Sequence, residues 1–165
     1  MAYHHLEDCL IKKAEDLKSY VKTGRTHLMD AMPIRLDQEL IAWAFQLSQN
    51  SGQLNSLLLD LKSLAQGGTA VGTGINSHPE FSDKFITELN VISGGDFTRS
   101  QNLFANISSQ DTAVALSGQL KTLAVTMTKI SNDLRWMNSG PLSGLGEIQL
   151  ESLQPGSSIM PGKVN

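Results

Sequence analysis

The chain has 165 residues, with 13 Lys and Arg against 16 Asp and Glu, and a formal net charge of −3 at pH 7. This balance, without a cluster of basic residues, gives no electrostatic basis for binding nucleic acid or an acidic membrane surface. Cys9 is the only cysteine, which excludes an intrachain disulfide and a metal site built from cysteines. No apolar run is long enough to cross a bilayer, and we expect a cytoplasmic protein.

Helical periodicity dominates the first half of the chain and predicts an all-α fold. A first helix is expected to end near Gly24, and a second to run from Leu36 or Asp37, after Pro33, to Gly67. Steps of three and four place one mainly apolar stripe on each segment, at Leu6, Leu10, Ala14, Leu17 and Val21 and then at Leu40, Ala44, Leu47, Ser51, Leu54, Leu58, Leu61 and Ala65.

The second half continues in the same way. A shorter helix is predicted for 79–92, ended by Gly94, and a long one for 100–137, while no alternating strand pattern is found. Residues 138–165 are expected to form a loop region. Helices of this length, rising only ~1.5 Å per residue, would reach past one small core. We therefore expect 1–165 to be a single partial domain, a long-helix bundle within a homo-oligomer.

Residues 22–30 read Lys-Thr-Gly-Arg-Thr-His-Leu-Met-Asp and are expected to lie between two helices, where side chains can face a cleft. Imidazole titrates near neutrality, so His27 suits proton transfer. The alternative is a loop histidine bonded to a neighbouring carbonyl. Arg25 and Asp30 are expected to pair and to pin this loop.

Residues 156–165 read Gly-Ser-Ser-Ile-Met-Pro-Gly-Lys-Val-Asn, in which the glycines and proline favour a tight loop. Such a loop could bring the hydroxyl of Ser157, the ammonium of Lys163 and the amide of Asn165 to one small anion, a carboxylate or a phosphate. Ser157 could act as nucleophile or base only if its hydroxyl is activated. The alternative is a flexible tail.

Several other features are interpreted as structural. The glycine-rich segment 67–76 lacks the Gly-Lys-Ser/Thr ending of a phosphate loop and is interpreted as a close-packed helix junction. Trp43 and Trp136 are expected in the core. Glu39 and Glu147 are interpreted as isolated carboxylates without partners, and no spacing typical of metal ligands occurs.

Two of these segments resemble motifs of the aspartase/fumarase superfamily. Residues 156–165 resemble its shared loop, and residues 24–31 resemble its second motif in the form found in class II fumarases. Residues 68–76 and 129–141 also match, so the resemblance covers nearly the whole chain in the right order. Aspartases usually carry glutamine at the position of His27, which favours the fumarase branch.

The sequence also departs from the family pattern at two positions. Asp37 stands where the family usually has glycine, and Leu142 stands where an arginine normally follows Ser-Gly-Pro. Gly162, by contrast, agrees with fumarases, since aspartases tend to have alanine there.

The resemblance implies a piece of the central helical domain of a considerably longer enzyme, a homotetramer whose active sites each gather segments from three subunits. It implies reversible hydration of fumarate to L-malate, a reaction of the tricarboxylic acid cycle, without a metal or organic cofactor. The implied roles are a base for Ser157, a proton donor for His27, substrate placement for Thr26, and carboxylate binding for Lys163 and Asn165.

Two alternatives stay open. One is an ammonia-lyase acting on aspartate or a related amino acid, which would share most of these motifs. The other is a non-catalytic, oligomer-forming helical fragment, because further segments expected to contribute to the site are absent from the 165 residues.

Overall fold

A computed structural model describes residues 2–156 and residue 159. The chain divides into two compact units, one made of residues 1–50 and 122–165 and the other of residues 51–121. Helices predominate in both, which confirms the predicted fold class, although each unit also contains a small sheet.

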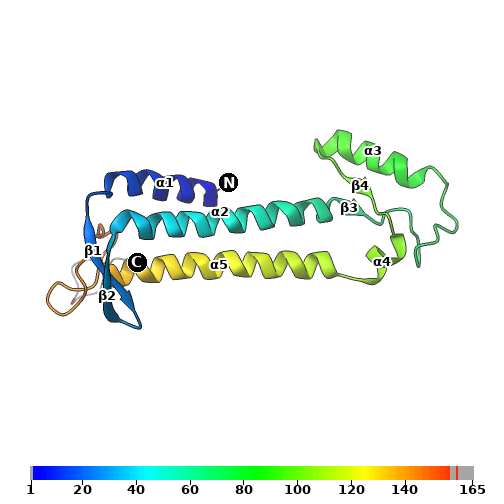
Figure 1. Ribbon diagram of the computed structural model, residues 1–165. Coiled ribbons are helices and arrows are strands. Elements are labelled where there is room, and N and C mark those ends of the chain that lie inside the picture. The colour runs from blue at the N-terminus through cyan, green and yellow to red at the C-terminus, as the bar shows by residue number, and fades with distance from the viewer. Residues whose placement is uncertain (1, 157–158, 160–165) are drawn as a thin grey trace. The chain divides into compact units, whose positions relative to one another are not determined.

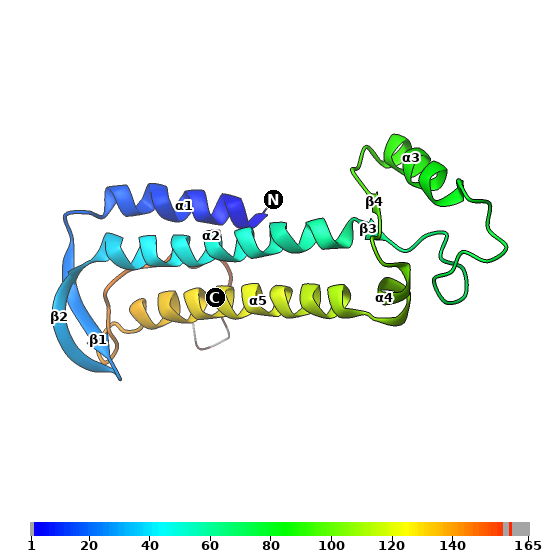
Figure 2. The same cartoon turned by 45° about the vertical axis from the view of Figure 1, so that its right-hand side comes forward.

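Three helical segments build the core of the first unit. They are α1 (Ala2–Asp16), the first part of α2 (Leu36–Leu61) and the last part of α5 (Asp111–Met137), with α2 lying between the other two in both views (Figures 1 and 2). Their facing apolar side chains form one buried cluster, which contains Leu10, Ala14, Leu36, Leu40, Trp43, Ala44, Leu47, Ile130 and Met137. The apolar periodicity predicted the contribution of the first two segments correctly at Leu10, Ala14, Leu40, Ala44 and Leu47. Trp136, expected in the core, is instead exposed.

A β-hairpin connects α1 to α2, where the sequence predicted no strand. Strand β1 (Val21–Thr26) pairs antiparallel with β2 (Met29–Arg35) (Figure 1). The first helix ends at Asp16 rather than near Gly24. Beyond Asp16 the chain forms turns closed by hydrogen bonds that span three residues, such as that from the Tyr20 N–H to the Leu17 carbonyl. Val21, expected on a helix face, is 69% exposed on the hairpin.

Gly24 lies at an irregularity in the hairpin ladder. Thr23 pairs with Pro33 and Arg25 pairs with Asp30, so β2 carries one more residue than β1 across this interval. A Cβ atom at Gly24 would lie 2.7 Å from the carbonyl oxygen of Met32, closer than real Cβ contacts allow. A glycine is therefore needed for the two strands to approach here.

The second unit begins with the end of α2, which stops at Leu61 and not at Gly67 as predicted. Beyond it, β3 (Ser63–Leu64) pairs in parallel with β4 (Thr98–Arg99). A Cβ atom at Gly68 would lie 2.5 Å from the side chain of Ile107 on α4 (Leu103–Ser108). The glycine-rich segment thus packs closely against a helix, as its interpretation as a junction required.

The remaining helices differ in how well they were predicted. Helix α3 (Phe81–Ser93) ends where expected, with Gly94 in the left-handed conformation (φ 65°) and its N–H bonded to the carbonyl of Asn90 at 2.9 Å. The helix predicted for 100–137 is wrong as a single element, because it is divided into α4 and α5. Ser109 is extended between them, and its hydroxyl accepts a hydrogen bond at 3.2 Å from the N–H of Asp111, the first residue of α5.

The chain that follows α5 is anchored to the end of that helix. Residues 138–156 form neither helix nor strand. The Glu147 N–H donates to the Met137 carbonyl at 2.8 Å, and the Leu150 N–H donates to Asn138 Oδ1 at 2.7 Å. Ile148 packs against the buried cluster. Within the described part of the chain, no helix combines the length and apolarity needed to span a membrane.

Candidate active site

The hairpin turn consists of His27 and Leu28. Both have positive φ, 54° and 62°, the combination found in two-residue turns that suit the twist of paired strands. Such turns usually hold asparagine or glycine, because other side chains crowd the backbone at a cost of about 1–2 kcal/mol per residue. A leucine in this conformation is unusual, and strain of this kind concentrates at functional sites.

The turn presents its side chains to solvent. Thr26 and His27 are both exposed. Among the residues that the structure describes, none forms a hydrogen bond or ion pair with the imidazole of His27, so the alternative of a histidine bonded to a neighbouring carbonyl is not what is observed. A solute can therefore reach both side chains in this chain.

Four charged side chains gather at the base of the hairpin, and we call them the hairpin ion cluster: Lys22, Arg25, Glu39 and Glu147. Lys22 Nζ lies 2.7 Å from Glu39 Oε2 and 2.5 Å from Glu147 Oε2, and Arg25 Nη1 bonds Glu147 Oε1. The interpretation of the two glutamates as isolated carboxylates was wrong. No local pattern indicated this cluster, since Glu147 is distant from the hairpin in the sequence.

The cluster is shielded and electrostatically coupled. The side chains of Lys22 and Glu147 are only 12% and 11% exposed. Desolvation is the largest single influence on Glu147 and raises its pKa, but the close contacts and charges of Lys22 and Arg25 together outweigh it and lower the pKa. The hydrogen bond to Glu147 raises the pKa of Arg25.

The predicted pairing of Arg25 with Asp30 exists but is secondary. Arg25 Nε lies 3.8 Å from Asp30 Oδ1, and the Asp30 side chain is largely in solvent. An exposed contact of this length adds little stability. Arg25 therefore pins the hairpin mainly through Glu147.

The two departures from the family pattern have different surroundings. Asp37 is buried and forms a two-point ion pair with Arg35, whose Nε and Nη2 lie 2.8 and 2.9 Å from its carboxylate oxygens. This hydrogen bonding, which outweighs desolvation, lowers the pKa of Asp37. Leu142 is almost completely exposed.

Three of the five predicted site residues lie outside the described part of the chain. These are Ser157, Lys163 and Asn165, together with the loop that would carry them. The structure thus brings Thr26 and His27 together at the turn and leaves their relation to the other three as a prediction. Among the described residues, no group of three His, Cys, Asp or Glu side chains is arranged to hold a metal ion.

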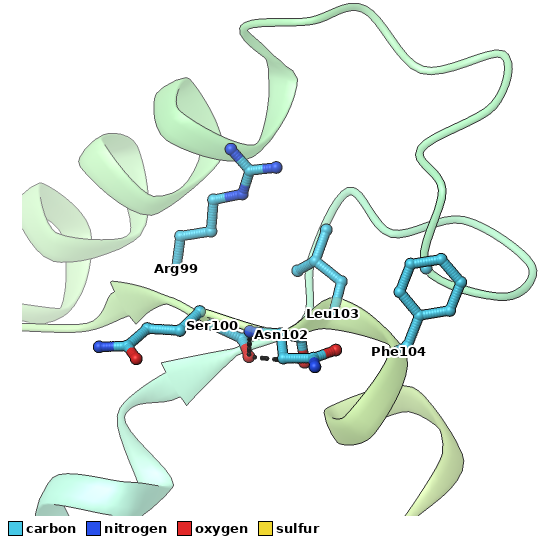
Figure 3. Close-up of a pocket in the computed structure, with 7 residues that line it drawn as sticks. Arg99, Ser100, Asn102, Leu103 and Phe104 are labelled. Carbon is cyan, nitrogen blue, oxygen red and sulfur yellow. Dashed lines mark hydrogen bonds between the residues drawn. The ribbon is translucent and has the colours of Figure 1, made fainter.

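A separate hollow in the second unit contains none of the predicted site residues. It has a volume of about 590 Å³ and is lined by Gly72, Arg99, Ser100, Gln101, Asn102, Leu103 and Phe104 (Figure 3). The Ser100 hydroxyl already donates to the Asn102 carbonyl and accepts from the Asn102 N–H. Ser100 and Asn102 thus hold the turn that precedes α4.

Comparison with known proteins gives a consistent result. A family model described as "Lyase" matches residues 1–165. The chain is 63% identical over 164 residues to a protein named fumarate hydratase class II 2 from Pseudomonas aeruginosa, and 54% identical over 164 residues to a fumarate hydratase class II from Xylella fastidiosa. Each match covers 99% of this chain but only 36% and 35% of the relative. The chain thus spans about a third of the length of these relatives.

Solved structures agree with the sequence matches. A fumarate lyase/delta crystallin from Brucella melitensis superposes with a TM-score of 0.92 at 43% identity, over 99% of this chain and 36% of that one. A recombinant class II fumarase from Schistosoma mansoni superposes with a TM-score of 0.88 at 36% identity, over 99% of this chain and 37% of that one. The likeness extends over the helices, the hairpin and the junctions alike.

Proposed function

The chain belongs to the lyase family, and from this premise we propose that the whole protein is a class II fumarate hydratase, which adds water reversibly to fumarate to give L-malate. The resemblance to class II fumarases that the motifs indicated is confirmed by relatives bearing that name. The observation that carries the proposal is the exposed turn with positive φ, which presents Thr26 and His27 to any solute.

The reaction requires three kinds of group. In the dehydration direction a base removes a proton from C3 of malate, and the electron pair moves into the adjacent carboxylate to give a dianionic aci-carboxylate. That charge needs fixed donors. The C2 hydroxyl then leaves as water after taking a proton from an acid, and the C2–C3 double bond forms.

Residues of this chain supply all three groups in our proposal. Ser157 is the base, and Lys163 with Asn165 stabilises the carboxylate that takes up the negative charge. His27 donates the proton to the departing hydroxyl, and Thr26 places the substrate. Closure of the loop that carries Ser157 would exclude water other than the reactant.

We further propose a homotetramer that acts in the tricarboxylic acid cycle in the cytoplasm, with each active site built from several subunits. Exposed apolar side chains on α5 and along the hairpin support the oligomer, since such surface is usually covered by a partner. These side chains are Val114, Leu120, Val125, Met127, Leu28, Met29 and Met32.

A substrate comparison tests this function. The whole protein should interconvert fumarate and L-malate, followed through the ultraviolet absorbance of fumarate, and should release no fumarate from L-aspartate. Ser157→Ala should remove most turnover with a smaller effect on KM, because it removes a base and not a binding group. Release of fumarate from aspartate alone would identify an ammonia-lyase, and inertness toward both substrates would favour a non-catalytic chain.

A further inference from the structure

Glu147 links β1 to the end of α5, and Lys22 extends this link to α2. The backbone of Glu147 is fixed to the end of α5, since its N–H donates to the carbonyl of Met137 at 2.8 Å. Its Oε2 lies 2.5 Å from Lys22 Nζ on β1, and its Oε1 is bonded by Arg25 on the same strand. Lys22 also reaches Glu39 Oε2 on the first turn of α2, at 2.7 Å.

The hairpin has few other contacts that could set its direction. Every residue of the buried cluster lies on a helix, and none belongs to β1 or β2. Nearly all side chains of β2 are exposed, whereas β1 is half-buried at Lys22, Thr23 and Arg25, two of which belong to the hairpin ion cluster. A two-stranded hairpin is marginally stable by itself. Its orientation against the helices therefore depends on its two ends and on the hairpin ion cluster.

The cluster is balanced in charge. Two cations, Lys22 and Arg25, face two carboxylates, Glu39 and Glu147, and the Lys22 and Glu147 side chains are largely shielded from solvent. Neutralising Glu147 would leave Arg25 without its main partner and would leave an excess positive charge beneath the strand. A shielded charge without a partner moves toward solvent. Because Arg25 directly precedes Thr26 in β1, that movement would displace the turn.

We propose that Glu147 is a positioning residue for the hydration reaction, holding the hairpin so that His27 meets the departing hydroxyl in a productive direction. This inference rests on the proposed function. Glu147 touches no reacting atom in this account and acts only through the turn. A displacement of about 1 Å at a reacting group can slow a reaction about 100-fold, so the effect should be measurable.

The experiment compares two backgrounds of the whole protein. In the otherwise unchanged protein, Glu147→Gln should lower kcat at least about tenfold and change KM less than about twofold, because geometry and not binding is altered. In a His27→Asn background, the same substitution should change the residual kcat less than about twofold, since the group it positions is already absent. Glu151→Gln, an exposed glutamate in the same segment, is the matched control and should leave kcat unchanged in both.

A second variant covers the case in which Glu147→Gln does not fold. Arg25→Lys keeps the charge but loses the planar guanidinium, and should give a smaller fall in kcat that again disappears in the His27→Asn background. A merely structural role would lower kcat by the same factor in both backgrounds, and that result, or an unchanged kcat, would overturn the inference. If the unsubstituted protein hydrates no fumarate, the proposed function fails and the inference fails with it. This result differs from the one above, in which the unsubstituted protein is active and only the inference fails.

Discussion

Lys22 Nζ lies 2.5 Å from Glu147 Oε2, which joins the strand before the hairpin turn to the segment after the last helix. Both side chains are shielded from solvent, and Glu147 receives a further bond from Arg25. This contact ties together parts of the chain that no local pattern relates, and it makes stability depend on the ionisation of one carboxylate.

The first prediction concerns acid. The pKa of Glu147 is lowered in the folded protein, because the close contacts and charges of Lys22 and Arg25 outweigh desolvation. A carboxyl with a lowered folded pKa stabilises the fold above its unfolded pKa, here about 4.5, and loses that contribution as pH falls through the folded value. Glu147→Gln should thus cost about 1–2 kcal/mol near pH 7 and progressively less in acid.

Urea unfolding of both proteins from pH 7 down to pH 3 measures this difference. The Glu151→Gln protein should follow the unsubstituted one throughout, because that glutamate is exposed. A stability gap between the Glu147→Gln and unsubstituted proteins that stays constant across the range would contradict the ionic origin of the effect.

The second prediction concerns the hairpin glycine. Gly24→Ala would place a Cβ atom 2.7 Å from a backbone oxygen of Met32, and backbone cannot move aside as a side-chain tip can. We expect a loss of about 1–3 kcal/mol, measured by thermal or urea unfolding, together with lower fumarate hydration. Gly52→Ala is the control, because nothing lies within 4 Å of its Cβ position in α2. It should be neutral or raise stability by up to about 1 kcal/mol.

The third prediction concerns the glycine-rich junction. Gly68→Ala would bring a Cβ atom to 2.5 Å from Ile107 Cδ1, the movable end of a side chain. Ile107→Val removes that methyl group and alone should cost about 0.5–1.5 kcal/mol. In the double variant the two losses should not add, since the second substitution relieves the clash of the first. If the two losses of stability simply add in unfolding measurements, contact with Ile107 is not the reason why a glycine is needed at position 68.

The sequence predicted the helices better than it predicted their connections. The start of α2 at Leu36 and the end of α3 at Gly94 follow from apolar spacing and from a glycine stop, both local signals. The hairpin carries neither signal: β2 is almost entirely exposed and lacks a buried apolar face, and the turn is His27-Leu28 instead of a glycine pair. Gly24 suggested the end of a helix, but in the structure it allows β1 and β2 to approach each other closely.

The candidate site divides in a similar way. Thr26 and His27 are neighbours in the sequence, so a short motif was enough to propose them together, and their roles stay predictions. The partnership of Glu147 with Lys22 and Arg25 could not be identified in this way, since it arises only when the segment after α5 folds back to β1. The sequence neighbours of Glu147 are a glycine and an isoleucine, so the sequence alone shows no charged partner for it.

The most direct test of the account is the turnover of fumarate by the whole protein after His27→Asn, compared with His5→Asn on the exposed surface of α1. If His27 donates the proton to the departing hydroxyl, its replacement should lower kcat about 10²–10⁴-fold, and replacing His5 should leave kcat unchanged. A His27→Asn protein that keeps nearly full kcat would contradict the claim that this turn delivers the proton.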